Sequence, residues 1–281
     1  MEKILSGAPV AAAIRERSKT EAEHLRRQGI IPCLAILRIG DRPDTASYAR
    51  SLVNNAPKSG VEARLIELPE SLSQGEALAR IRSLNQDGTV HGILLLRPLP
   101  AQLEEDALCQ AITPEKDVDC ATDLSLAGVF AGKSLGFPPA TPRAVMELLR
   151  YYQISLAGKK AVVLGRSLVV GRPLAMLLLQ EHATVSICHS KTEDLTVYTR
   201  QADIIVAAMG KAKAVGAELL GQDQIIIDVG IHRSEDGSLC GDVDFAAAEP
   251  LAAAITPVPG GVGAVTTALL LQQVIEAAAL S

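Results

Sequence analysis

Short apolar runs alternate with helix-like segments along this chain, and this alternation limits the fold more than any other feature. Gly92–Leu96 is almost wholly apolar, as expected of a strand that is buried on both faces. A chain that alternates in this way forms a parallel sheet, because each helix returns it by a right-handed crossover. In the N-terminal half, the predicted strands are Pro32–Ile39, Val61–Leu68 and Gly92–Leu96, and the predicted helices cover about 45–58, 74–85 and 102–112.

The alternation stops after residue 112 and resumes near residue 160. Thr113–Pro142 contains scattered Gly and Pro with little periodicity, a helix is predicted over Thr141–Arg150, and Gln153–Gly158 has the composition of a link. We therefore expect a domain junction here and a second α/β series after it. Its predicted strands are Lys160–Leu164, Thr184–Cys188, Asp203–Ala207 and Gln224–Val229, and a Gly-rich loop and a helix within Gly260–Leu280 end the chain.

Composition excludes several classes of function. With 27 Lys and Arg against 32 Asp and Glu, the net charge is −5, so we expect no nucleic-acid partner. The five cysteines are far apart and the five histidines share no ligand spacing, which predicts no disulfide framework and no metal site. We find no signal-peptide pattern and no apolar stretch of about 18 residues, so we expect a cytoplasmic protein without a membrane partner.

A glycine-containing turn follows the strand Lys160–Leu164. Gly165 ends the strand, Gly171 comes six residues later, and Pro173 suits a first helical turn. Glycine lets a backbone approach a phosphate, and a helix N-terminus supplies free N–H groups. An ordinary turn between a strand and a helix has the same pattern, so this segment alone leaves both interpretations open.

The end of the next strand indicates which nucleotide would bind. A free ribose 2′-hydroxyl usually meets an Asp or Glu at this point, but here His189, Ser190 and Lys191 follow Cys188. A hydroxyl and a cation, together with Arg166, suit a 2′-phosphate and favour NADP over NAD. A solvated loop with an incidental lysine is the alternative.

Two further loops follow apolar strands in the second half. Asp228–Ile231 and Pro257–Gly263 are expected at the carboxyl edge of the sheet, where ligands bind in open α/β folds. Pro257–Gly263 contains three glycines and two prolines in seven residues, more than a purely structural turn requires. We therefore expect it to contact a ligand.

Together these motifs resemble the methylenetetrahydrofolate dehydrogenase/methenyltetrahydrofolate cyclohydrolase family over essentially the whole chain. The matching segments are Ser47-Tyr48, Gly92-Ile93-Leu94 with Pro98-Leu99-Pro100, Pro114-x-Lys116-Asp117-Val118-Asp119, Thr141-Pro142, Gly165–Ser167 with Val170–Pro173, Asp228–Gly230, Gly241–Val243 and Pro257–Gly263. The resemblance implies an N-terminal folate-side α/β domain, a C-terminal Rossmann-like NAD(P) domain, an active site in the interdomain cleft and a homodimer. We expect residues 1–142 and a C-terminal helix 263–281 in the folate-side domain, and residues 143–262 in the NADP-binding domain.

The resemblance assigns roles to individual residues. Tyr48 and Asp119 are the expected catalytic groups. The substrate-binding residues are expected to be Tyr48, Pro98, Leu99, Asp119, Pro259, Gly260, Gly261 and Val262. The cofactor-binding residues are expected to be Gly165, Arg166, Ser167, Val170, Gly171, Arg172, Pro173, His189, Ser190, Lys191 and Ile231.

The sequence departs from the family pattern on the folate side. The family has Tyr-x-x-x-Lys on a helix, but Leu52 stands at the lysine position, and Leu96 stands where a glutamine reaches that lysine. Cys120 replaces a glycine, and Ala264 and Val265 replace a Pro-Met pair. Leucine can neither donate, accept nor carry a proton. We therefore predict an NADP-dependent methylenetetrahydrofolate dehydrogenase in one-carbon metabolism whose cyclohydrolase activity is weak or lost.

Three other functions stay open at this point. The chain could be fully bifunctional through a substitute catalytic group, or a non-catalytic protein that binds NADP or folate. It could also be a dehydrogenase for a different small substrate in a more apolar cleft.

Overall fold

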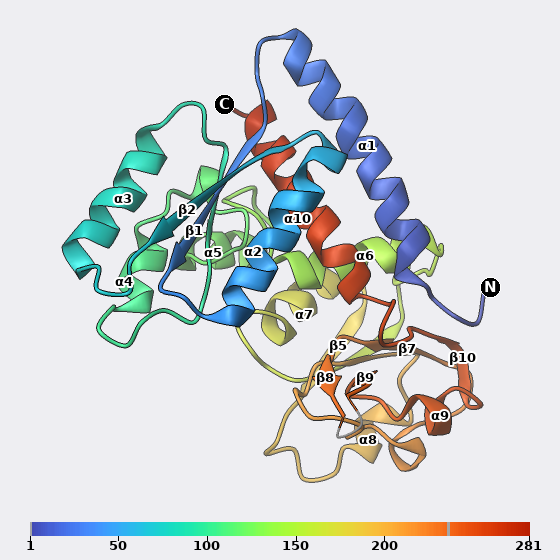
Figure 1. The fold of residues 1–281 in the computed structure, drawn as a ribbon. Helices are drawn as coiled ribbons and strands as arrows, with labels where there is room; N and C mark the ends of the chain where they lie inside the picture. Colours follow the sequence, from blue (N-terminus) through green and yellow to red (C-terminus); the bar gives the residue numbers. More distant parts are fainter. Residues whose placement is uncertain (1, 235–236) are drawn as a thin grey trace. The chain divides into compact units, whose positions relative to one another are not determined.

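The computed structural model describes residues 2–234 and 237–281, which form two compact units (Figure 1). The N-terminal unit comprises Ala13–Ala140 and Thr267–Ser281. The C-terminal unit comprises the residues up to Ala12 and Thr141–Thr266. The helices α1 (Gly7–Arg27) and α10 (Gly263–Ala279) contribute residues to both units.

The N-terminal unit is built on a parallel sheet, as predicted, and the order of its strands is β2-β1-β3. Its strands are β1 (Cys33–Ile39), β2 (Glu62–Leu68) and β3 (Gly92–Leu95), and its shorter helices are α2 (Pro43–Asn55), η1 (Ala56–Ser59), α3 (Gln74–Gln86), α4 (Glu105–Gln110), η2 (Pro114–Lys116) and α5 (Asp123–Ala131). The helix predicted over 102–112 is therefore confined to α4, and the segment predicted to have little regular structure contains α5.

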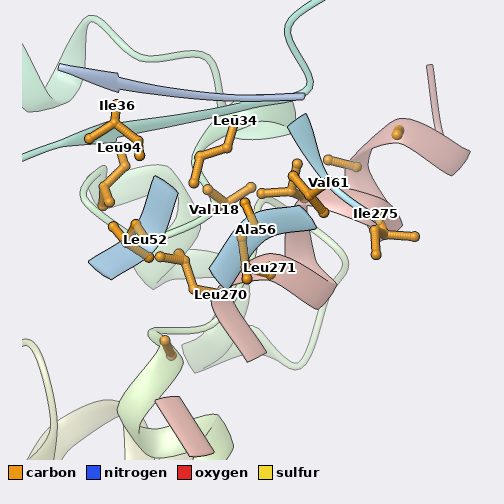
Figure 2. Packing of buried hydrophobic residues seen from close by; sticks show 14 of the residues in the cluster. Leu34, Ile36, Leu52, Ala56, Val61, Leu94, Val118, Leu270, Leu271 and Ile275 are labelled. Carbon is orange, nitrogen blue, oxygen red and sulfur yellow. The ribbon is translucent and has the colours of Figure 1, made fainter. Parts of the chain in front are cut away.

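Helices cover both faces of this sheet, which explains why its strands are apolar on both sides. Leu34 and Ile36 of β1 pack in one apolar cluster with residues of α2 and α10 (Figure 2). Ala35 and Leu37 point to the opposite face and pack with residues of α3 and α4.

The C-terminal unit contains a five-stranded parallel sheet in the order β10-β7-β6-β4-β5. Its elements are α6 (Ala140–Tyr151), β4 (Lys160–Leu164), α7 (Gly171–Gln180), β5 (Thr184–Cys188), α8 (Thr196–Thr199), β6 (Ile204–Ala207), η3 (Ala217–Leu219), β7 (Gln224–Asp228), β8 (His232–Arg233), β9 (Leu239–Cys240), α9 (Phe245–Ala248) and β10 (Ala252–Ile255). The carboxyl ends of the parallel strands meet at one edge of the sheet, and the candidate loops follow those ends.

The start of the chain belongs to the C-terminal unit, although residues 1–142 were expected together. The N–H of Leu5 donates to Ile255 O, and the N–H of Ile255 donates to Lys3 O, both at 2.8 Å. The segment thus extends the sheet beyond its edge strand β10. The expected division into a folate-side domain and an NADP-binding domain, with boundaries at residues 142 and 262, remains a proposal. In the described ranges, no helix is long and apolar enough to cross a membrane.

Candidate functional site

The turn between β4 and α7 leaves no space for side chains at its glycines. Gly165 has φ +131°, and a Cβ there would lie 2.1 Å from the carbonyl oxygen of Ala208. The Oγ of Ser167 accepts hydrogen bonds from the N–H groups of Val170 at 3.1 Å and Gly171 at 3.4 Å, and so holds the turn that leads into α7. The sequence thus sets a tight strand–turn–helix connection at the carboxyl edge of the sheet.

A first cavity of about 250 Å³ lies beside this turn. Its walls combine the turn with the ends of β5 and β6: Leu164, Gly165, Arg166, Ser167, Cys188, His189, Ser190, Leu195, Ala208 and Met209. Arg166 is a cation in these walls, and none of the described residues that form them is a carboxylate. The cavity is therefore suited to an anionic ligand.

Hydrogen bonds fix the loop that follows β5. The N–H of His189 donates to Thr192 Oγ1 at 3.0 Å, and the Nδ1 of the same imidazole accepts from the N–H of Lys191 at 3.2 Å. The imidazole thus stabilises the turn that presents Ser190 to the first cavity. Lys191, Val170, Gly171, Arg172 and Pro173, which were predicted to bind the cofactor, are not among the described residues that line this cavity.

A second cavity, of about 280 Å³, lies at the ends of β7 and β10. It is lined by Asp228–Ile231, Leu239 and Pro257–Ala264, which include the predicted residues Ile231, Pro259, Gly260, Gly261 and Val262. Asp228 is buried, and its burial raises the pKa of the carboxyl to about 6 against the opposing effect of backbone N–H donors.

In the N-terminal unit, Tyr48 and Asp119 lie close enough to interact electrostatically. Tyr48 is on α2 and is 44 % exposed, but burial around its hydroxyl and the charge of Asp119 raise the pKa of the phenol to about 12. Burial also raises the pKa of Asp119 to about 6, and the charge of Arg97 opposes this shift. A neutral phenol can donate a hydrogen bond and an ionised carboxylate can accept one, so this pair could hold a polar heterocycle.

A buried aspartate fixes the turn that carries Asp119. The carboxylate of Asp117 accepts hydrogen bonds from the N–H groups of Ala121 and Thr122 and from the hydroxyls of Thr122 and Ser125, at 2.6–2.9 Å. Cys120, at the position where the family pattern has glycine, has φ +56°. That left-handed conformation costs a residue with a side chain about 1 kcal/mol.

Leu52 and Leu96, which were expected at the lysine and glutamine positions of the family pattern, are buried. Leu52 has no exposed surface, Leu96 is 4 % exposed, and both belong to the same apolar cluster. Figure 2 shows Leu52 between Leu94 of β3 and Leu270 of α10. Both positions are therefore part of the core of the N-terminal unit.

The segment after β3 carries the other predicted folate contacts. Pro98 is exposed, whereas Leu99 is half-buried and packs with the cluster that contains Ala35 and Leu37. Arg97 forms an ion pair with Glu105 at 3.5 Å.

Some residues of the two cavities were not in the predicted site. Ala208 and Met209 line the first cavity, and Leu239 lines the second. The rule that ligands bind beyond the carboxyl ends of parallel strands could have found Ala208 and Met209, because they follow the strand 204–207 directly. Leu239 lies on a two-residue strand that has no clear signal in the sequence. In the part of the chain that the structure describes, no three His, Cys, Asp or Glu side chains are grouped so that they could hold a metal ion.

A parallel sheet with ligand-sized cavities at its carboxyl edge defines an α/β protein of the nucleotide-binding class. Residues 5–119 match the model of the catalytic domain of tetrahydrofolate dehydrogenase/cyclohydrolase, and residues 139–281 match the model of its NAD(P)-binding domain. The chain therefore belongs to the tetrahydrofolate dehydrogenase/cyclohydrolase family of enzymes.

Individual relatives match along their full length. The protein named "Bifunctional protein FolD" from Alkaliphilus oremlandii is 45 % identical, and the match covers 100 % of this chain and 98 % of the relative. The crystal structure of the bifunctional FolD enzyme from Campylobacter jejuni has a TM-score of 0.96 and 41 % identity, covering 99 % of this chain and 98 % of that one. The FolD of Trypanosoma brucei, solved with NADP and an inhibitor, has a TM-score of 0.90 and 34 % identity, and the match covers 100 % of this chain and 99 % of that one.

Proposed function

We propose that this protein is an NADP-dependent methylenetetrahydrofolate dehydrogenase whose cyclohydrolase activity is weak or lost. The observation that carries the proposal is the burial of Leu52 and Leu96 in one apolar cluster. Losing the lysine alone would leave an unpaired buried glutamine, whereas two leucines leave no polar group without a hydrogen-bond partner. The pair is therefore consistent with the loss of a polar function rather than with its relocation.

The dehydrogenase step does not require the missing groups. The methylene carbon loses a hydride, and the two nitrogens beside it stabilise the resulting cation, so no protein acid or base is obligatory. When bound, NADP supplies the hydride acceptor. Tyr48 and Asp119 would bind and orient the pterin, and orientation alone can contribute about 7–11 kcal/mol to a reaction between two bound groups.

The cyclohydrolase step has different requirements. Water attacks the methenyl carbon and protons must move, and general acid–base help contributes about 10²–10⁴-fold to such steps. Neither Leu52 nor Leu96 can take part in proton transfer. We therefore expect hydrolysis to be slow compared with hydride transfer.

The first cavity supports NADP as the cofactor. Arg166 supplies a cation and Ser190 a hydroxyl to the same cavity, and these groups fit the 2′-phosphate that distinguishes NADP from NAD. The tight turn at Gly165 has no room for a side chain and places backbone at the wall of this cavity, where a bound phosphate could approach it closely.

The direct test uses purified protein with NADP and 5,10-methylenetetrahydrofolate. NADPH and the methenyl product are followed at separate wavelengths, and preformed methenyltetrahydrofolate is then added to measure hydrolysis. We expect NADPH to form and the methenyl product to accumulate. Hydrolysis as fast as hydride transfer would overturn the proposal.

A fully bifunctional enzyme is the second candidate, because curated relatives such as that of Alkaliphilus oremlandii are named as bifunctional proteins. The double variant Leu52→Lys/Leu96→Gln separates the two candidates. If the leucines removed the second reaction, the double variant should gain hydrolysis by about 10-fold or more. Leu52→Lys alone is the control, and it should only destabilise the fold, because it buries an unpaired amine.

The same assay tests the remaining alternatives. NADP binding without turnover of any reduced folate would indicate a non-catalytic binding protein, and turnover of another compound would indicate a different substrate.

We also propose that the protein acts as a homodimer in the cytoplasm. Sedimentation of the purified protein would test the dimer.

A further inference from the structure

Asp242 is a buried carboxylate on which four donors converge. It has no exposed surface and follows β9 in the segment Gly241–Val243. The backbone N–H groups of Met209, Gly210 and Lys211 donate to it, those of Gly210 and Lys211 at 3.0 Å. The Nε2 of His232 is 2.7 Å from its Oδ1. Because an ionised carboxylate can only accept, Nε2 carries the proton in this contact.

The backbone around Asp242 is held by a second buried carboxylate. Oδ1 of Asp228 accepts from the N–H groups of Gly230 at 2.9 Å and Asp242 at 3.0 Å. Its Oδ2 accepts from the N–H of Val243 at 2.9 Å. The two aspartates thus link the end of β7, the segment after β9 and the loop after β6 in one network.

The two carboxylates of this network pack closely against the backbone of two glycines. A Cβ at Gly230 would lie 2.4 Å from Oδ1 of Asp242, and a Cβ at Gly241 would lie 1.9 Å from Oδ2 of Asp228. Each carboxylate therefore rests directly against backbone. A change in the position of Asp242 must be transmitted to the segments that it contacts.

These segments form walls of both cavities in the C-terminal unit. Met209, whose N–H donates to Asp242, lines the first cavity. Gly230 and Ile231, which precede His232, line the second, as does Leu239 of the hairpin formed by β8 and β9. His232 supplies the side-chain donor that connects this hairpin to Asp242.

We propose that His232 is a positioning residue for cofactor binding: through Asp242 it couples the hairpin at the second cavity to the loop Met209–Lys211 at the first. The inference rests on the proposed function only in taking NADP as the ligand of the first cavity. His232 itself is not placed in contact with the cofactor. Its imidazole sets the position of a carboxylate that in turn sets the position of a cavity wall.

The first test needs no ligand. In the His232→Leu variant, amide hydrogen exchange at Met209, Gly210 and Lys211 should rise about 10-fold, because one of the four donors that hold Asp242 is lost. His232→Gln should restore most of the protection, since its amide nitrogen reaches about as far as Nε2 and can donate. The control His24→Leu removes an exposed imidazole of α1, which contacts Gln28 just after that helix, and it should change nothing at this loop.

The second test is a titration of each variant with NADP. We expect the Kd of His232→Leu to rise about 10-fold, with His232→Gln within about twofold of the unchanged protein. A purely local role in the hairpin would leave exchange at Met209–Lys211 unchanged, and that result would overturn the inference. If the unchanged protein does not bind NADP, the proposed function is wrong, and the exchange measurement alone decides the role of His232.

Discussion

Two aspartates in one motif have opposite effects on the energy of the folded state. Asp117 is fully buried, and its carboxylate accepts hydrogen bonds from Ala121, Thr122 and Ser125. Asp119, two residues later, is partly buried, and the pKa of its carboxyl rises to about 6 from 3.8. The first aspartate therefore holds the turn together, whereas the second is kept at a cost in stability.

The Asp119→Asn substitution should stabilise the protein at neutral pH. Because the folded-state pKa is raised, Asp119 costs no stability below about pH 4, where it is protonated in both states, and the protein loses stability as the pH rises through about 6. The neutral amide avoids this loss, so the variant should gain about 1–2 kcal/mol in the free energy of unfolding at pH 8 and nothing near pH 4. Urea unfolding across this pH range measures the difference.

The matched control for this experiment is Asp117→Asn, which should destabilise the protein by about 2–4 kcal/mol because buried donors lose their acceptor. An Asp119→Asn variant that is less stable than the unchanged protein at pH 8 would contradict the prediction. Under the proposed function, the same variant should bind folate more weakly.

Sequence motifs could identify the candidate site residues, but they could not show which side chains pack around each of them in the folded protein. Tyr48 and Asp119 follow from the letters of the sequence together with a family resemblance. That Leu52 and Leu96 share one apolar cluster depends on Leu94 and Leu270, which come from distant parts of the chain. No local pattern encodes such a contact, because it forms only when the sheet and α10 pack together.

At the scale of elements, the predicted strands agree with the observed ones to within one residue at each end, both in the interior and at the edge of the sheets. The strands 160–164 and 184–188 have the predicted bounds, although β4 is buried and β5 is a half-exposed edge strand. In contrast, β10 has the sequence Ala-Ala-Ala-Ile, and alanine has low strand propensity. An apolar strand was expected before Pro257–Gly263, but neither its bounds nor its pairing with β7, a tertiary effect, could be predicted. The sequence does contain end signals for α5: Thr122 is a typical N-cap residue, and Gly132 is a typical glycine at a helix C-terminus, where it has φ +63°.

Two helical glycines test how packing overrides helix propensity. Nothing lies within 4 Å of a Cβ placed at Gly75 in α3, whereas a Cβ at Gly128 in α5 would lie 2.3 Å from the carbonyl oxygen of Leu135. Gly75→Ala should therefore stabilise the protein by about 0.5 kcal/mol, and Gly128→Ala should destabilise it by about 2 kcal/mol. Denaturant midpoints of the two variants provide the measurement, and shifts of the same sign would refute it.

At the scale of the whole molecule, each unit combines one long internal segment with one end of the chain. The residues up to Ala12 complete the C-terminal unit, and Thr267–Ser281 complete the N-terminal unit. Apolar periodicity reports only which residues are buried, so it could place a junction near residue 142 but could not assign the N-terminal segment. That assignment depends on which sheet edge the segment meets.

Leu5→Ala should loosen the C-terminal unit selectively. Leu5 has no exposed surface, and its N–H donates to Ile255 O at the edge of the five-stranded sheet. Removing its side chain should cost about 2–4 kcal/mol, because a buried leucine leaves a cavity when it is truncated. We expect amide exchange to increase in β10 and β7 and to stay unchanged in β1 and β3. Ile4→Ala, at a residue that is 39 % exposed, is the control and should have a much smaller effect. An equal increase in all four strands would mean that the two units unfold as one, and the N-terminal segment would then stabilise the molecule as a whole.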